Sequence, residues 1–286
     1  MTFTTGFYDA AARAAGQLGL EECQISAIDT TGDPEYTERL HELGFGSFEL
    51  PPQLAASLRH LSDALTEPSP EAECWIRVCE RGALHFLQRT LLSAGVGVPC
   101  FEWAHATDRT CTRFAEAHAA FAHTDLRVDG LTMYNIWVPL CTEVVSEPLL
   151  LFVAASQIDC SSWREPRDKA HHLPRHCAED GEWRFFSGMG RGRCVIFPGD
   201  GGAEGRIFHA SASATTGHRR SFDVREFVVP AGDKEASDAL VWHDAEERLA
   251  REETTWLAEA RDLMSRASRS GGAPVERETE TAGRTI

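Results

Sequence analysis

The residues with the clearest capacity for chemistry are a histidine and an aspartate two positions apart, His123 and Asp125. On an extended segment, side chains alternate between two faces, so these two residues project to the same side. A second histidine from a distant strand would complete the set of two imidazoles and one carboxylate that holds non-haem iron(II) and leaves coordination positions open. His209 is the candidate, and the three residues are the predicted metal-binding and catalytic set.

Arginines that follow the distal histidine could return to the same site. A strand-like segment at 206–211 is followed, after a short turn, by a second one at 219–229, which predicts a hairpin. An arginine on the second strand would then lie beside the metal, where its guanidinium can bind a carboxylate through two parallel hydrogen bonds. The candidates are Arg219, Arg220 and Arg225.

The surroundings of these residues supply further motifs. The triplet is followed by the strand-like Leu131–Leu140, then by the apolar Pro148–Ser156, and then by Gly190–Phe197 ahead of the distal histidine. In content and order these segments resemble the iron(II)/2-oxoglutarate-dependent dioxygenases, in particular the phytanoyl-CoA dioxygenase-like branch. The resemblance extends over about residues 40–229.

The resemblance implies that the metal-binding set holds Fe(II), at which the cosubstrate 2-oxoglutarate and O2 would react. It also implies that Arg220, eleven positions past the distal histidine, binds the remote carboxylate of 2-oxoglutarate, with Arg225 as the alternative. Thr132 and Asn135, on the strand after the triplet, are candidates for hydrogen bonds to the cosubstrate. The expected reaction is hydroxylation, and desaturation, cyclisation or epoxidation are alternative outcomes of the same oxidation chemistry.

Two departures from the family bear on the reaction. Asp125 stands where the family's halogenases have a small residue, which favours hydroxylation over halogenation. The segment Ala154–Gln157 lacks the family's motif at that place, so the substrate does not follow from the resemblance.

A local cluster of basic residues lies in the long connection 157–187 of an otherwise acidic chain. Connections longer than about 15 residues inside a domain are usually functional or disordered. One interpretation is a lid that binds an anionic molecule, phosphorylated or nucleoside-like, in natural-product biosynthesis. The alternative is a solvated loop that offsets nearby acids. The candidate substrate-binding residues are Tyr134, Arg164, Arg167 and Arg175.

Composition limits the partners of the protein. A formal net charge of −16 disfavours binding to nucleic acids or anionic membranes, since both depend on a basic surface. Nine cysteines without a C-x-x-C pair argue against a disulfide framework and a thiolate zinc site. No apolar run or signal-peptide pattern is apparent. We therefore expect a cytoplasmic protein that acts on a small molecule.

Short apolar strands punctuated by glycine and proline, with helices before and after them, predict a mainly β fold with flanking helices, a double-stranded β-helix (jelly roll or cupin-like). The predicted single domain covers 1–267, with a helical N-terminal part at 1–95, a β-helix core at about 96–230 and a helix at about 234–267. That helix covers the barrel or joins two subunits of a homodimer. The tail 268–286 is predicted to be disordered. His85, in a predicted helix, is expected to be an ordinary core or surface histidine.

Two other functions use the same residues. A cupin-like binding protein would employ the triplet structurally, without turnover. A zinc hydrolase would bind its metal through two histidines and a carboxylate. The hydrolase is disfavoured because the sequence shows no recognisable general base near the triad.

Overall fold

The computed structural model describes the chain in a series of segments. They comprise residues 27–29, 40, 44–64, 70–100, 111–113, 123–125, 128–140, 149–154, 171–172, 181–185, 192–202, 207–211, 220–232 and 239–270. Within these segments, no helix is both long enough and apolar enough to cross a bilayer.

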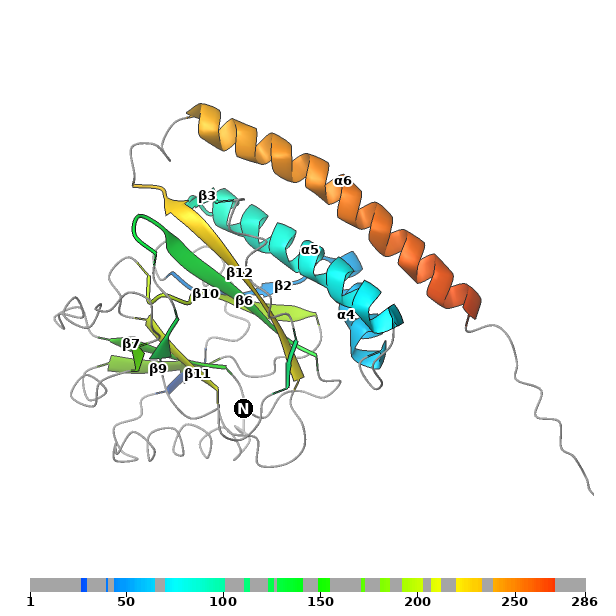
Figure 1. The fold of residues 1–286 in the computed structure, drawn as a ribbon. Coiled ribbons are helices and arrows are strands. Elements are labelled where there is room, and N and C mark those ends of the chain that lie inside the picture. The colour runs from blue at the N-terminus through cyan, green and yellow to red at the C-terminus, as the bar shows by residue number, and fades with distance from the viewer. Residues whose placement is uncertain are drawn as a thin grey trace, which may run out of the picture.

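The strands form two sheets, which are mainly antiparallel (Figure 1). The sheet that the helices cover, called the covered sheet below, contains in spatial order β2 (Gly46–Glu49), β10 (Arg193–Pro198), β6 (Thr132–Pro139), β12 (Arg220–Pro230) and β3 (Gly97–Pro99), and β4 (Cys111–Arg113) also pairs with β12. The second sheet contains in spatial order β1 (Ala27–Asp29), β9 (Gly181–Phe185), β7 (Leu149–Ala154), β11 (Ile207–Ser211), β5 (His123–Thr124) and β8 (His171–His172).

The chain passes back and forth between the sheets: β4, β6, β10 and β12 belong to the covered sheet, whereas β5, β7 and β11 belong to the second. The predicted hairpin of 206–211 with 219–229 is therefore wrong. β11 pairs with β5 and β7, while β12 pairs with β6, β3 and β4. Alternation along a strand indicates which faces are apolar, and it does not identify the partner strand. The crossing pattern is compatible with the predicted jelly roll.

The helices cover one face of the covered sheet. α4 (Pro52–Ala64) and α5 (Pro70–Ser93) both begin with proline, whose fixed φ and missing N–H suit the first helical position. α5 ends in a Schellman motif: Gly95 has a φ of 76 replaced here by its own value of 68°, and Val96 N–H donates to the Leu91 carbonyl at 3.0 Å. The predicted helices in this region are thereby confirmed.

The two left-handed glycines of this region are distinct: φ is 68° at Gly95, which ends α5, and 76° at Gly44, which precedes β2. The Gly44 N–H donates to the Leu40 carbonyl at 2.8 Å, so both glycines satisfy a backbone carbonyl of the preceding turn. Such a backbone conformation is accessible to glycine without a steric penalty. These two positions therefore set where the chain turns towards β2 and β3.

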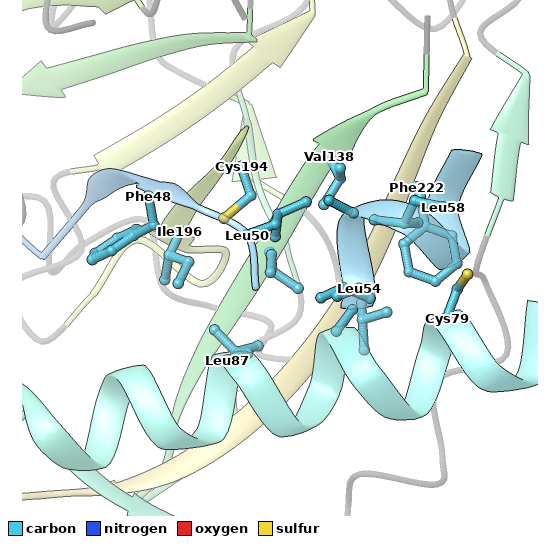
Figure 2. Close-up of a cluster of buried hydrophobic side chains, with 14 of the residues drawn as sticks. Phe48, Leu50, Leu54, Leu58, Cys79, Leu87, Val138, Cys194, Ile196 and Phe222 are labelled. Carbon is cyan, nitrogen blue, oxygen red and sulfur yellow. The ribbon is translucent and has the colours of Figure 1, made fainter. Parts of the chain in front are cut away.

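Strict alternation along the central strands separates packing from chemistry. On β6 and β12, the even-numbered residues Tyr134, Ile136, Val138, Phe222 and Val224 belong to the hydrophobic cluster beneath the helices. Figure 2 shows the arrangement: strand side chains point towards α5, whose own inward side chains meet them. The odd-numbered residues of these strands have the opposite orientation and face away from the helices.

The long helix α6 (Ala239–Ser270) lies along α5 on the outside of the molecule (Figure 1). Its buried residues Trp256, Ala260 and Leu263 join the same hydrophobic cluster as the inward side of α5. This packing corresponds to the first of the two predicted roles, in which the helix covers the barrel. A homodimer through this helix stays a prediction.

One buried charge-bearing group interrupts the apolar face of β12. Glu226 is fully buried, and its carboxyl accepts hydrogen bonds from the side-chain amide of Gln88 and from the N–H of Phe227, the latter at 2.9 Å. Burial raises the pKa of Glu226 to about 8, against the opposing effect of these two donors. The side chain is therefore mostly protonated at neutral pH.

The raised pKa predicts a pH-dependent stability. The unfolded chain releases this proton near its ordinary pKa of 4.5, whereas the folded chain retains it up to about 8. Folding stability is therefore greatest at low pH within this window and falls as the pH rises from about 4.5 to about 8. Glu226→Gln should remove this fall, with a gain over wild type on the order of a few kcal/mol at the upper end.

Urea unfolding across this pH range checks the prediction. Glu246→Gln, a change of the same type on the exposed side of α6, is the matched control and should keep the wild-type profile. Parallel profiles for Glu226→Gln and wild type would show that Glu226 does not carry the dependence.

Candidate metal centre

Asp125 follows the short strand β5 and is tied to the covered sheet by backbone hydrogen bonds. Its N–H donates to the carbonyl of Gly199 at 2.6 Å, and the N–H of Gly199 donates to the carbonyl of Met133 at 2.8 Å. Asp125 is buried, with 8% of its surface exposed. The turn after β10 thus holds the aspartate against β6, between the two sheets.

Three side chains surround the Asp125 carboxylate. The Nε2 atom of His209 lies 3.6 Å from Oδ2, and the Asn135 amide donates to the same oxygen at 2.9 Å. On the other side, the guanidinium of Arg225 donates to Oδ1 at 3.4 Å. Asn135 and Arg225 are direct cross-strand partners of odd number on β6 and β12, so both point away from the helices.

His209 is buried on β11 and packs against an aromatic ring. The rings of His209 and Phe197 have centroids 5.0 Å apart and are inclined at 50°. Phe197 is the cross-strand partner of Asn135, which in turn is paired with Arg225. One row of the covered sheet therefore presents an aromatic ring, an amide and a guanidinium to the two candidate metal ligands of the opposite sheet.

His123 is placed by its backbone. It is the direct cross-strand partner of His209 on β11, and on its other side it pairs with His172 of β8. Residues paired directly across antiparallel strands share a face of their sheet. The side chains of His123 and His172 lie outside the described part of the structure. Register alone thus brings the first and last residues of the predicted triad together.

The described residues fit a metal ion as far as they can be tested. Two ligands each at about 2.1 Å from one ion, as for zinc, lie at most about 4.2 Å apart. The separation of 3.6 Å between His209 Nε2 and Asp125 Oδ2 falls within this limit. Among the described side chains, no group of three metal-ligating residues occurs, so His123 would have to supply the third ligand.

The remaining predicted residues divide into two groups. Tyr134 belongs to the hydrophobic cluster beneath the helices, and burial raises the pKa of its hydroxyl. This corrects its prediction as a substrate-binding residue, because the side chain faces away from Asp125. Thr132 is buried and shares the strand parity of Tyr134. The second group lies outside the described side chains and comprises Arg164, Arg167, Arg175, Arg219 and Arg220.

Sequence reasoning missed the turn that positions the aspartate. A Cβ on Gly199 would lie 2.7 Å from the Asn135 amide nitrogen and 2.9 Å from Asp125 Oδ2, closer than real side-chain contacts. The next residue, Asp200, accepts hydrogen bonds from the N–H groups of Met133 and Gly202 at 3.1 and 2.9 Å. A glycine and an aspartate directly after an apolar strand were the available signal, and they indicated only a flexible turn.

Comparisons with known proteins give weak likenesses. No family model matches this chain, and no curated protein matches its sequence. Similar solved structures include the iron and alpha-ketoglutarate-dependent endoperoxidase NvfI, with 16% identity and a TM-score of 0.42 over 71% of this chain and 84% of that chain. The non-heme alpha ketoglutarate dependent epimerase SnoN from nogalamycin biosynthesis has 14% identity and a TM-score of 0.38, over 71% and 88% of the two chains.

A prolyl-4-hydroxylase from Pseudomonas putida is also similar, with 14% identity and a TM-score of 0.36 over 68% of this chain and 97% of that chain. Likeness at this level does not decide the activity of this chain. The functional assignment depends on the residues around Asp125 and His209.

The close approach at Gly199 predicts that metal binding is sensitive to a single methyl group. Gly199→Ala should displace the carboxylate of Asp125 or the amide of Asn135, and lower the affinity for Mn(II) by about 10–100-fold, as is usual when the support of a metal ligand is lost. Calorimetric titration with Mn(II) measures the effect. Gly232→Ala, which places a methyl group in open space, is the matched control. Equal affinities of the two variants would contradict the role of Gly199.

Proposed function

We propose that this protein is a non-haem iron(II)- and 2-oxoglutarate-dependent oxygenase that hydroxylates a small molecule. The observation that carries the proposal is the buried pair of Asp125 and His209, 3.6 Å apart, with His123 directly opposite His209 in register. Two imidazoles and one carboxylate are the ligand set of such oxygenases. When bound, iron with 2-oxoglutarate and O2 supplies the oxidation of an unactivated C–H bond.

The protein's own residues hold the ligand set in place. The Asn135 amide fixes the orientation of the Asp125 carboxylate through Oδ2, and the ring of Phe197 limits rotation of the His209 imidazole. Groups of this kind orient metal ligands and raise their affinity. Burial of both ligands between the sheets also keeps bulk water from the site, which strengthens electrostatic interactions there.

Arg225 is the residue that we propose for the remote carboxylate of 2-oxoglutarate. Its guanidinium reaches the Asp125 carboxylate from the covered sheet, and its side chain is 36% exposed, which leaves donors free for a second acid. Arg220, five residues earlier on β12 and so of opposite strand parity, is the alternative from the spacing in the family that the sequence resembles.

We further propose that the fold is a double-stranded β-helix. In the covered sheet β4, β12, β6 and β10 are neighbours in that order, and in the second sheet the order is β5, β11, β7 and β9. Consecutive strands therefore lie on opposite sheets, as winding of a paired chain around a barrel requires. This winding is what brings β5 and β11 side by side although they are far apart in sequence.

For the substrate, we propose an anionic small molecule. The basic residues at 164, 167 and 175 support this in a chain whose net charge is −16. Charge-assisted hydrogen bonds from arginine would hold a phosphate or carboxylate group near the site. Hydroxylation is the proposed outcome, and the position of the substrate decides between it and desaturation, cyclisation or epoxidation.

Formation of succinate tests the class of enzyme. Wild-type protein with Fe(II), 2-oxoglutarate and O2 should form succinate slowly without added substrate. Asp125→Ala should lose this activity and bind Fe(II) at least about tenfold more weakly, because it removes a charged ligand. Asp244→Ala, on the exposed side of α6, is the matched control. A wild-type protein that binds neither Fe(II) nor 2-oxoglutarate would instead favour a cupin-like binding protein.

The cosubstrate arginine is tested by two parallel variants. Arg225→Ala should raise the KM for 2-oxoglutarate about 10–100-fold, the loss expected for hydrogen bonds between charged groups. Arg225→Lys should restore part of it, because lysine keeps the charge without the planar fork. Arg220→Ala should retain the wild-type KM. The reverse result, with only Arg220→Ala impaired, would assign the cosubstrate to Arg220.

A further inference from the structure

A cavity of about 1150 Å³ lies beside the outer helices, on the side of the covered sheet that faces away from Asp125. It is lined by the C-terminal half of α5 and the middle of α6, with the end of β2 and the start of α4 as further walls. Figure 1 shows α6 running along α5 at this place. The lining residues used below are Phe48, His85, Phe86, Arg89, Trp256 and Leu257.

His85 lies in this cavity without a hydrogen bond. It is 5% exposed, and neither of its ring nitrogens has a hydrogen-bond partner among the described residues. The nearest acidic oxygen, Oε2 of Glu253, lies 3.9 Å from Nε2, beyond hydrogen-bonding distance. His85 is therefore not the ordinary, satisfied histidine that the sequence predicts. Buried polar groups without partners are rare in native structures and call for an explanation.

A second polar group without a partner lies next to it. Trp256 is 4% exposed, and its indole nitrogen has no hydrogen-bond partner among the described residues. The two rings have centroids 6.2 Å apart and are inclined at 47°. Burial lowers the pKa of His85, so the neutral ring offers one donor and one acceptor, while Trp256 offers a donor. The cavity thus presents an unused set of donors and acceptor.

The remaining walls indicate the character of a ligand. Phe48, Phe86 and Leu257 supply apolar surface. Arg89 is engaged by Glu253 at 3.1 Å, and Glu49, 84% exposed in its side chain, adds negative charge at the rim. An anionic ligand would therefore meet a paired cation and further acid, whereas a neutral ring would lose little on leaving water.

We propose that this cavity is a second binding site, for a neutral, ring-containing molecule with a hydroxyl group. The ring lies on the apolar walls, and the hydroxyl exchanges hydrogen bonds with His85 and accepts one from Trp256. A hydroxyl is suited to this place because it donates and accepts at the same time. The site is separate from the metal centre and does not depend on the proposed function.

Equilibrium dialysis with 2-naphthol tests the proposal, with 2-naphthoate and 2-methoxynaphthalene as matched probes that add a charge or remove the donor. Wild-type protein should bind 2-naphthol saturably, and each matched probe at least about tenfold more weakly. His85→Leu should lower the affinity for 2-naphthol at least about tenfold. His60→Leu, which changes a histidine stacked on Trp75 outside the cavity, should have no effect.

Thermal unfolding separates loss of a site from loss of the fold. His85→Leu should raise the Tm, because it removes two buried nitrogens without partners. If that variant does not fold, Trp256→Phe, which keeps the ring and removes the donor, takes its place. Failure of wild type to bind 2-naphthol, or equal affinity in the two histidine variants, would overturn the proposal. So would loss of 2-naphthol binding in Asp125→Ala, since the probe would then lie at the metal centre.

Discussion

The burial of one carboxylate between two sheets is the constraint on which the rest of this structure depends. A carboxylate removed from water is stable only where donors or cations compensate for the lost hydration. Asp125 obtains them from both sides: an amide and a guanidinium from the covered sheet, and an imidazole from the second. A bound cation would complete this compensation, so the same arrangement that makes the carboxylate costly makes the place suitable for a metal.

The precision of this arrangement comes from the hydrophobic side of the covered sheet. α4, α5 and α6 hold the even-numbered residues of β6 and β12 in a close-packed cluster. Because alternate residues are fixed there, the odd-numbered ones are held equally well on the other face. Asn135 and Arg225 therefore reach Asp125 from a rigid surface, and a site built on strands is better ordered than one built on loops.

The helical side is not purely structural, because it retains polar groups that packing does not require. Glu226 is kept uncharged by burial and by its position against α5, whereas His85 and Trp256 face a cavity with their polar atoms unused. These two cases differ in their energetics. Glu226 has donors and adjusts by protonation, while His85 has no partner and remains a cost to the folded state until something binds.

The sequence by itself determined the elements and the ligand types. Spacing of apolar residues predicted α4, α5 and the strands β6, β7 and β10, and the pair His123 and Asp125 indicated a metal site because period-two alternation is a local property of extended chains. Only the tertiary structure decided the rest. It showed that β11 pairs with β5 and not with β12, that Tyr134 faces the helices, and that Gly199 touches Asp125. Strand partners and close backbone approaches join residues far apart in the chain, and no local pattern encodes them.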